Sequence, residues 1–231
     1  MREIVCELKN VSKTFENNQC CPIKAVNLKI QKGDYISIEG SSGIGKSTLL
    51  YIIGCLVEPT SGEISYYGEK IENYTEHFLL PIRRRYISYI FQDYRYIELF
   101  TVKENLMFAG RYRNISQEEL KHEVKYYLEK LDLQNKEDAY PYNLSGGQKR
   151  RLMIALALIK DAQIIIADEP TNDLDLSMEE TILNLFEQKI SEGKTIILST
   201  HNLRVSQRVH LRYQIKNSKL SVIGASCIIQ T

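Results

Sequence analysis

Short apolar segments alternate with polar positions along the first third of the chain, in the spacing typical of β-strands. Residues 4–8 alternate between apolar and charged side chains, and residues 25–30 do the same. Residues 35–38 are more continuously apolar and run into a glycine-rich loop. The next segment, 48–53, is apolar on nearly every side and stops at a glycine, which predicts a buried helix. A further strand is expected at 64–66, after a turn.

The middle of the chain, from about residue 93 to residue 159, has helical spacing and contains no convincing strand. Ser116 and Glu119 have the separation of a helix capping box. The apolar residues that follow are spaced like one face of a helix: Leu120, Val124, Tyr127, Leu128 and Leu131. This segment is therefore predicted to be a helical insertion.

Strands return after the insertion. Residues 164–167 are uniformly apolar, Ser177 and Glu180 have the spacing of another capping box, and residues 195–199 form a second apolar strand. A strand–helix–strand unit with apolar strands indicates a parallel sheet that helices cover on both faces. The predicted fold class is α/β, with a mostly parallel sheet and an inserted helical part.

Composition narrows the functional classes. The chain has 231 residues, 43% of them apolar, which suits one large domain or one domain with an insertion. Thirty Lys and Arg against 29 Asp and Glu leave a formal charge of +1, which argues against nucleic-acid binding through bulk charge and against a polybasic membrane anchor. The five cysteines have neither metal-binding nor disulfide spacing and are expected to be reduced thiols: Cys6, Cys20, Cys21, Cys55 and Cys227.

Neither a signal peptide nor a membrane span is expected. The N-terminal ten residues have no apolar core, and the longest apolar run, 152–159, is far shorter than the ~20 residues that cross a bilayer. We therefore expect a cytoplasmic chain. Basic triplets at 83–85 and 149–151 are expected to be solvated or to form local ion pairs, with contact to lipid headgroups as the alternative.

The glycine-rich loop before the helix at 48–53 fits the pattern G-x-x-x-x-G-K-[ST]. Its glycines let backbone N–H groups turn toward a phosphate, and the positive end of the helix points at the same place. Lys46 adds a charge for the β- and γ-phosphates, and the Ser47 hydroxyl is a ligand for Mg²⁺. The residues predicted to bind ATP here are Gly40, Ser41, Ser42, Gly43, Ile44, Gly45, Lys46, Ser47 and Thr48.

Two acidic residues follow the strand at 164–167, at the edge where α/β sheets bind ligands. Asp168 is predicted to hold Mg²⁺, directly or through water. Because adjacent strand residues face opposite ways, Glu169 is expected to address a water molecule instead, as a general base or a positioning group. An N-cap and a surface acid would be the ordinary interpretation of an isolated pair, but the phosphate loop upstream favours the catalytic one.

Five further segments resemble motifs of the ATP-binding cassette (ABC) ATPases, and with the phosphate loop they span residues 11–201. Residues 144–148 read LSGGQ, the signature of that family. The other four are similar to the A-loop aromatic, the Q-loop, the D-loop and the switch histidine, at Phe15, Gln92, Thr171–Asp175 and His201. The resemblance implies catalytic roles for Glu169, His201 and Gln92, and Mg²⁺ coordination by Ser47, Gln92 and Asp168.

The same resemblance implies a P-loop NTPase core of the RecA-like type, with an N-terminal antiparallel β subdomain and an inserted α-helical subdomain. Residues 1–231 would form one ABC ATPase domain. Its core would comprise 1–92 and 160–231, and its helical subdomain about 93–159. Phe15 would stack on adenine.

The signature implies a head-to-tail dimer with a second copy of this chain or a homologous ABC subunit, with Asp175 at the seam. The signature residues would bind the ATP that the partner's phosphate loop holds: Ser145, Gly146, Gly147 and Gln148. Ser145 and Gln148 also have capping-box spacing, but a simple cap has no need of two glycines in the first helical turn. Two departures from the family pattern are Ile44 and Asn202, the latter at a position where an Asp is frequent.

With one cassette and no coiled-coil insertion, the chain resembles the stand-alone ATP-binding subunit of a membrane transporter, peripheral on the inner face of the membrane through a separate permease. Residues 54–56 with 59–63, and residues 101–105, resemble the macrolide-exporter, lipoprotein-release and bacteriocin-export branch, which implies export or clearance of a peptide, antimicrobial or lipid-like substrate. The alternative is a regulatory cassette that signals through a membrane partner to a cell-wall enzyme or sensor. Four residues are candidates for permease contact, or equally for the core of the helical part: Tyr94, Tyr96, Leu99 and Phe100.

Overall fold

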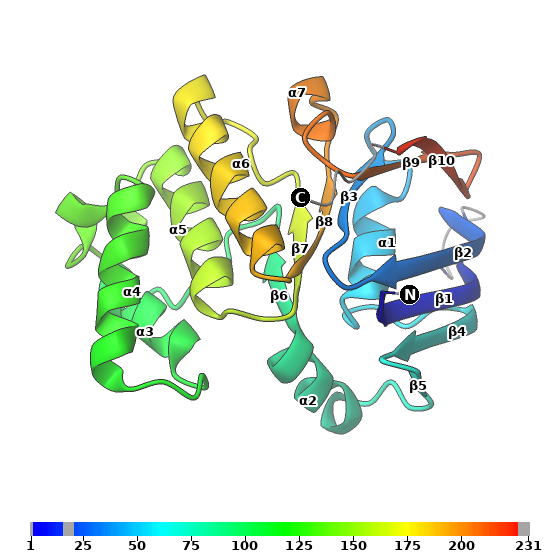
Figure 1. The fold of residues 1–231 in the computed structure, drawn as a ribbon, viewed down its shortest axis with the longest axis horizontal. Coiled ribbons are helices and arrows are strands. Elements are labelled where there is room, and N and C mark those ends of the chain that lie inside the picture. Colours follow the sequence, from blue (N-terminus) through cyan, green and yellow to red (C-terminus); the bar gives the residue numbers. More distant parts are fainter. Residues whose placement is uncertain (1, 16–20, 226–231) are drawn as a thin grey trace.

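Two β-sheets hold the strands of the computed structural model, which describes residues 2–15 and 21–225 (Figure 1). The smaller sheet is antiparallel, in the order β2–β1–β4–β5. Its strands are β1 (Ile4–Lys13), β2 (Ile23–Gln31), β4 (Ser61–Tyr66) and β5 (Glu69–Lys70). The larger sheet runs β10–β9–β3–β8–β7–β6 and is parallel except for the β9–β10 pair. Its strands are β3 (Tyr35–Glu39), β6 (Ile87–Ile90), β7 (Ile164–Asp168), β8 (Thr195–Ser199), β9 (Leu211–Lys216) and β10 (Lys219–Ala225).

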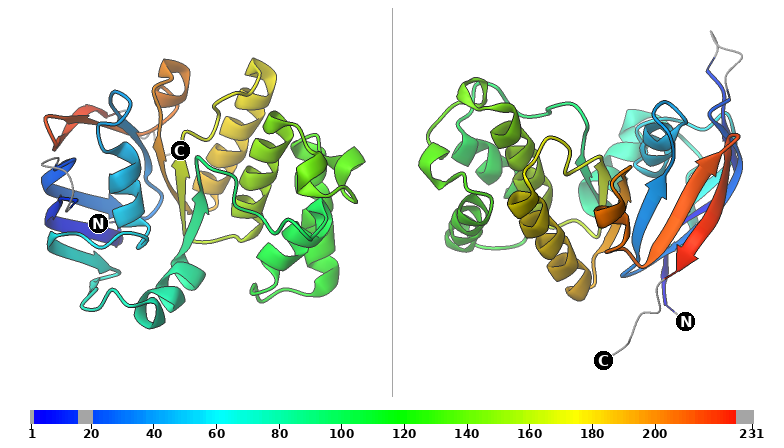
Figure 2. Two further views of the ribbon diagram at one scale, coloured as in Figure 1. Left: turned by 180° about the vertical axis from the view of Figure 1, so that it is seen from behind. Right: turned by 90° about the horizontal axis from the view of Figure 1, so that it is seen from above.

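Apolar side chains of the central strands alternate between two cores, because successive residues of a strand point to opposite faces. Ile165 and Ala167 of β7 pack with residues of α5 (Gly146–Ile159) and α6 (Leu176–Ser191). Ile164 and Ile166 belong to the other core, with α1 (Lys46–Ile53) and the smaller sheet. Figures 1 and 2 show α1 between the two sheets and α5 and α6 on the opposite side of the larger one. The predicted parallel sheet with both faces covered is confirmed.

Helices α3 (Val102–Gly110), α4 (Gln117–Lys130) and α5 gather beyond the edge strand β6, with short 3₁₀ turns at Gln134–Lys136 and Pro141–Asn143 (Figure 1). Helix α4 begins as predicted. The Ser116 Oγ accepts a hydrogen bond from the Glu119 N–H at 3.1 Å, and Glu119 Oε2 accepts one from the Ser116 N–H at 2.7 Å. The domain boundaries proposed from the sequence stay a prediction.

The start of α6 differs from the prediction. Asp175 is its N-cap, because Asp175 Oδ1 accepts a hydrogen bond from the Met178 N–H at 2.9 Å. Ser177 and Glu180 therefore lie inside the helix and do not cap it. A carboxylate is also a strong N-cap, and here it stands two residues before the serine.

Hydrophobic periodicity gave no signal for four other parts of the fold. Helix α2 (Glu76–Tyr86) contains Pro81 and buries only Leu79, so it has almost no apolar stripe. The four-residue strand β6 and the largely half-exposed hairpin β9–β10 were likewise not anticipated, nor was the short α7 (Leu203–Ser206).

The described residues bear on two expectations from the composition, those about membrane spans and about the cysteines. None of the helices there is both long and apolar enough to cross a bilayer. Cys6 and Cys55 are buried free thiols, and burial raises the pKa of Cys55 to about 11. Cys20 and Cys227 lie outside the described residues.

Candidate functional site

The phosphate loop and the residues that follow β7 and β8 enclose a cleft of about 510 Å³. The loop backbone is left-handed at Gly43 and Gly45, with φ of +74° and +115°. A Cβ atom at Gly45 would lie 2.9 Å from the carbonyl oxygen of Pro22, so this turn requires glycine. The cleft is lined by Gly40, Ser41, Ser42, Gly43, Gly45, Lys46, Ser47, Thr48, Gln92, Asp168, Glu169, Asn172 and His201.

The first turn of α1 places positively polarised N–H groups and the Lys46 ammonium at one side of this cleft. Gly45 is the N-cap residue and no side chain of the described residues caps the helix, so its N-terminal N–H groups are available to an anion. The buried Lys46 donates from Nζ to the carbonyl oxygens of Gly40 at 2.9 Å and Ser41 at 3.2 Å. The ammonium group is thus held within the loop, where phosphate oxygens would be stronger acceptors than these carbonyls.

Asp168 and Glu169 form the acidic side of the cleft, and Ser199 connects them. The Ser199 Oγ donates to Asp168 Oδ1 at 2.5 Å and accepts from the Glu169 N–H at 3.0 Å. Glu169 has φ of +50°, so the chain leaves the extended conformation at this residue. Glu169 thus lies beyond the end of β7, where strand alternation does not set the direction of its side chain, and both acidic residues line the cleft. Glu169 Oε1 lies 3.6 Å from Lys46 Nζ.

The second carboxylate oxygen of Asp168 suits Mg²⁺ coordination. Asp168 Oδ2 is buried and has no hydrogen-bond partner among the described residues, and Ser47 and Gln92 line the same cleft. Within residues 2–15 and 21–225, no group of three or more His, Cys, Asp or Glu could hold a metal alone. Mg²⁺ binds through one or two carboxylates together with water and substrate phosphates, so these residues fit a metal that arrives with a nucleotide.

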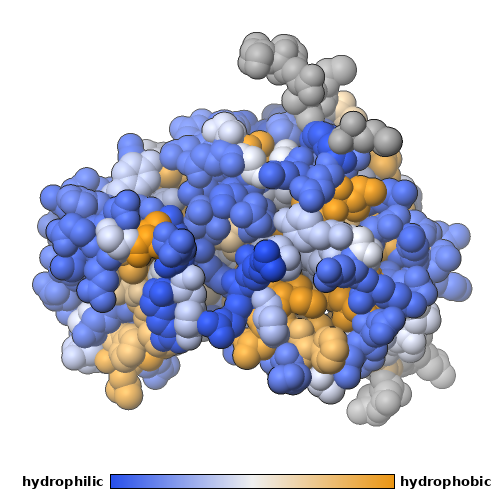
Figure 3. All heavy atoms as spheres, turned by 60° about the horizontal axis from the view of Figure 1, so that its bottom comes forward, coloured by the Kyte–Doolittle hydropathy of each residue, from blue (hydrophilic) through white to orange (hydrophobic). Residues whose placement is uncertain are grey.

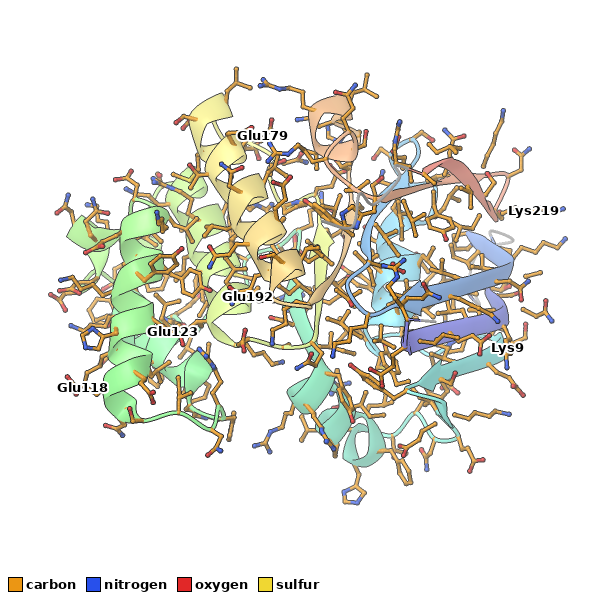
Figure 4. The ribbon with its side chains drawn as sticks, in the orientation of Figure 1. Lys9, Glu118, Glu123, Glu179, Glu192 and Lys219 are labelled. Atoms are coloured by element: carbon orange, nitrogen blue, oxygen red, sulfur yellow. The ribbon has the colours of Figure 1, made fainter. Side chains whose placement is uncertain are left out.

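His201 lies next to Glu169, and the residue after it anchors its loop. His201 Nδ1 is 2.8 Å from Glu169 Oε2, while most of the imidazole is exposed. Asn202 Oδ1 accepts from the Arg204 N–H at 2.9 Å and caps α7, and Asn202 Nδ2 donates to Glu179 Oε2 at 2.7 Å. Glu179 stands near the N-terminal end of α6, toward α7 (Figure 4). An aspartate at 202 could supply the cap but not this donor.

Three groups of predicted residues lie outside the cleft. Ile44 packs with the core around α1, and the exposed Phe15 lies 5.3 Å from Lys13 Nζ, measured to the ring centre. The signature residues Ser145, Gly146, Gly147 and Gln148 are not among the cleft residues and begin α5. They do form a capping box, yet a Cβ at Gly146 or Gly147 would meet no described atom closer than 3.5 Å. The described part of the chain therefore does not itself require these two glycines.

Three residues at or beside the cleft were missed from the sequence. Asn172 lines it directly, and Ser199 bridges the two acidic residues. Arg150 was expected to be solvated or ion-paired, but it is buried and donates to the carbonyl oxygens of Phe91 and Gln92. Arg150 stands between Lys149 and Arg151 in the sequence, so nothing there distinguishes it from its basic neighbours or indicates its acceptors.

Comparison with known proteins agrees with this geometry. Residues 23–172 match the ABC transporter family. The chain is 37% identical over 218 residues to the macrolide export ATP-binding/permease protein MacB of Mannheimia succiniciproducens, covering 94% of this chain and 34% of that protein. It is 39% identical over 207 residues to the methionine import ATP-binding protein MetN 1 of Bacillus cereus, covering 88% of this chain and 59% of that protein. The chain thus spans about a third of the first relative and under two thirds of the second.

A solved structure extends the match to three dimensions. A dimeric, post-hydrolysis ATP-binding cassette bound to ADP and Pi superposes with a TM-score of 0.87 at 34% identity, covering 96% of this chain and all of that one. Sequence, fold and cleft agree: the chain belongs to the ABC transporter family and is one of its ATP-binding, ATP-hydrolysing cassettes.

Proposed function

We propose that this chain is the ATPase subunit of a membrane transporter, closing as a dimer around two ATP molecules and driving a separate permease. The observation that carries the proposal is that some of the ABC motifs line the cleft while the signature motif lies elsewhere. The cleft holds the phosphate loop, Asp168, Glu169 and His201, whereas the signature turn lies outside it and has two glycines that no described atom of this chain crowds. A phosphate that a second subunit presents would approach the backbone at these glycines.

Each cleft residue has a distinct role in this proposal. The loop N–H groups and Lys46 bind the phosphates, and Ser47, Gln92 and Asp168 hold Mg²⁺, which supplies charge neutralisation when bound. Glu169 orients the attacking water and accepts its proton, since its carboxylate lies between Lys46 and His201. His201, exposed beside Glu169, contacts the γ-phosphate. Phe15 stacks on adenine beyond the cleft.

The proposed dimer is head-to-tail, with a second copy or a homologous subunit. The residues at the start of α5 would contact the partner's γ-phosphate, because a helix N-terminus favours an anion and two glycines let it approach the backbone closely: Ser145, Gly146, Gly147 and Gln148. Dimeric cassettes among the solved relatives support this arrangement.

A mixing experiment tests shared sites. Ser145→Arg and Lys46→Ala proteins should each be nearly inactive, and their mixture should regain ATP hydrolysis at up to one working site per dimer. Each mixed dimer joins an intact Lys46 to an intact Ser145 at one site only. Ser116→Arg, which alters the matching cap of α4, serves as the control and should stay active alone. No recovery, or full recovery, would overturn the shared sites.

The permease is proposed to dock on the face that carries α2. A groove of about 360 Å³ lies there between α2 and α5, and Figure 3 shows hydrophobic surface on this side of the molecule, divided by hydrophilic surface. Its walls combine apolar side chains with basic ones: Leu56, Leu80, Phe91, Met153, Leu156, Arg83, Arg84, Arg95 and Lys160. Burial and two neighbouring arginines lower the pKa of Lys160 to about 8, and none of the described residues lining the groove is acidic. A partner segment that is apolar and bears a carboxylate would complement it.

The residues proposed from the sequence for permease contact differ in how exposed their side chains are. Leu99 is 85% exposed and Tyr94 is 41% exposed, whereas Tyr96 packs against the core. Leu99 and Tyr94 therefore support contact with the permease better than Tyr96 does. The helical part, about 93–159, would then receive the permease, while 1–92 and 160–231 hold ATP at the inner face of the membrane.

The cargo is proposed from kinship: a peptide, antimicrobial or lipid-like compound that is exported or cleared. Reconstitution with the co-purifying permease in vesicles tests it, by measuring whether ATP turnover and substrate movement rise together. Turnover without movement would favour the regulatory alternative. No nucleic-acid partner is proposed.

A further inference from the structure

Four contacts join the segment 91–95 to one face of α5. Arg150 Nη1 donates to the Phe91 carbonyl at 2.7 Å, and Arg150 Nη2 donates to the Gln92 carbonyl at 2.9 Å. The Tyr94 hydroxyl donates to the Gly146 carbonyl at 3.2 Å, and the Arg95 N–H donates to Met153 Sδ at 3.1 Å. The α5 residues involved, Gly146, Arg150 and Met153, are four and three positions apart and so share a face of the helix. We call these contacts the Q-loop clamp.

Arg150 is the centre of the clamp. Only 5% of the residue is exposed, and it forms no ion pair among the described residues, so its charge is balanced by carbonyl oxygens. The planar fork of a guanidinium matches two consecutive carbonyls, which a single lysine ammonium cannot reproduce with the same geometry. The guanidinium also lies 5.8 Å from the ring centre of Tyr94, so two of the contacts reinforce each other.

The clamp connects two places that serve different ATP molecules in the proposed dimer. Gln92 lines the cleft of its own subunit, whereas Gly146 belongs to the signature turn that faces the partner's ATP. A shift of the 91–95 segment would therefore carry the first turn of α5 with it, and the reverse also holds.

We propose that Arg150 is a positioning residue that makes Gln92 and the signature turn move as one unit, so that each ATP site of the dimer responds to the other. This inference rests on the proposed head-to-tail dimer. The same unit borders the groove proposed for the permease, because Phe91, Arg95 and Met153 line it. A partner bound in the groove would contact the clamp residues and thereby affect both ATP sites of the dimer.

The test uses mixed dimers that keep a single working site. One subunit carries Lys46→Ala and the other carries Ser145→Arg, so the working site joins the Lys46 and Gln92 of the second subunit to the signature of the first. Arg150→Lys is then placed in either subunit. Both placements should lower the turnover of that one site, by roughly tenfold, because each loses a charge-assisted hydrogen bond of the clamp.

The matched control is Arg151→Lys, since Arg151 donates to the carbonyls of Leu131 and Asp132 at the far end of α4, away from the cleft. It should leave turnover nearly unchanged in both placements. Tyr94→Phe, which removes only the bond to Gly146, should act in the same direction as Arg150→Lys and replaces it if that variant does not fold.

An effect of Arg150→Lys in only one placement would overturn the inference, because the residue would then serve the Q-loop or the signature alone. Equal loss in the Arg151→Lys control would also overturn it, by showing a general loss of stability. Absence of activity in the parent mixed dimer would instead refute the proposed shared sites, so the two failures are distinguishable.

Discussion

The Ser199 hydroxyl donates a hydrogen bond to Asp168 Oδ1 over 2.5 Å, and both residues are buried. The same oxygen accepts the N–H of Glu169, so one hydroxyl orients the carboxylate proposed to bind Mg²⁺ and the backbone of the proposed base. The other oxygen of Asp168 has no hydrogen-bond partner in the described part of the chain. The strand β8 therefore determines which oxygen of Asp168 is available to a metal.

Ser199→Ala should weaken both stability and catalysis. Removing the hydroxyl leaves a buried carboxylate oxygen and a buried N–H unsatisfied, which should cost about 1–3 kcal/mol in the free energy of unfolding. The Mg²⁺ concentration needed for half-maximal ATP hydrolysis should rise as well. Ser206→Ala removes another buried hydroxyl, which donates to the Leu203 carbonyl, and should reduce stability alone. An unchanged Mg²⁺ dependence in Ser199→Ala would contradict the orienting role.

Glu169→Gln should bind ATP yet hydrolyse it very slowly. The amide keeps the size of the side chain but cannot accept a proton from water. The variant should accumulate as an ATP-bound dimer, which size-exclusion chromatography with and without ATP measures. Glu63→Gln, on an exposed ion pair with Lys70, should hydrolyse normally. A parental rate in Glu169→Gln would remove the proposed base.

The hydrogen bond from Asn202 to Glu179 predicts that Asn202→Asp destabilises the protein and that Glu179→Gln compensates for the loss. Asn202→Asp keeps the cap of α7 but places two carboxylates at 2.7 Å, and should cost about 1–2 kcal/mol in the free energy of unfolding. Adding Glu179→Gln restores a donor and should recover most of that loss. A double-mutant cycle measured by denaturant unfolding checks it, and additive effects of the two changes would disprove the contact.

A charged network predicts how stability responds to acid. Burial opposes ionisation of Asp161, but the nearby Lys189 and Lys194 outweigh it and hold the pKa of that carboxyl below its usual value. The two ammonium groups lie 3.1 Å from Asp161 oxygens, and Lys189 also pairs with Glu192. Glu192 directly follows the last residue of α6 (Figure 4). Because the folded pKa is depressed, this stabilisation is complete above the unfolded pKa, about 3.9, and is lost as pH falls through the folded pKa.

Asp161→Asn should therefore lower the free energy of unfolding at pH 7 by about 2 kcal/mol, and the difference from the parent should shrink as pH falls below about 4. Denaturant unfolding at a series of pH values measures both effects. Asp132→Asn, which removes a carboxylate from an exposed pair with Arg151, should cost less than about 1 kcal/mol. A loss at pH 7 that persists unchanged in acid would show that Asp161 acts by packing.

Much of the site could be predicted because its chemistry is local in sequence. The phosphate loop needs glycines and a lysine at set intervals, and Asp168 and Glu169 follow an apolar strand directly. The bridge through Ser199 and the fork of Arg150 could not be predicted, since their acceptors lie 31 and 58 or 59 residues away. Helix α2 could not be predicted for a different reason: it buries too little apolar surface to produce a periodic pattern in the sequence.

The sequence by itself determined the α/β class, the phosphate loop, the order of the motifs and the membership of the family, because spacing along the chain carries all of these. Only the tertiary structure decided which side chains meet. It brought Asp168, Glu169 and His201 to one cleft and left the signature turn outside it. It also tied that turn to Gln92 through Arg150, since hydrogen bonds between distant segments depend on how strands and helices pack and not on their spacing.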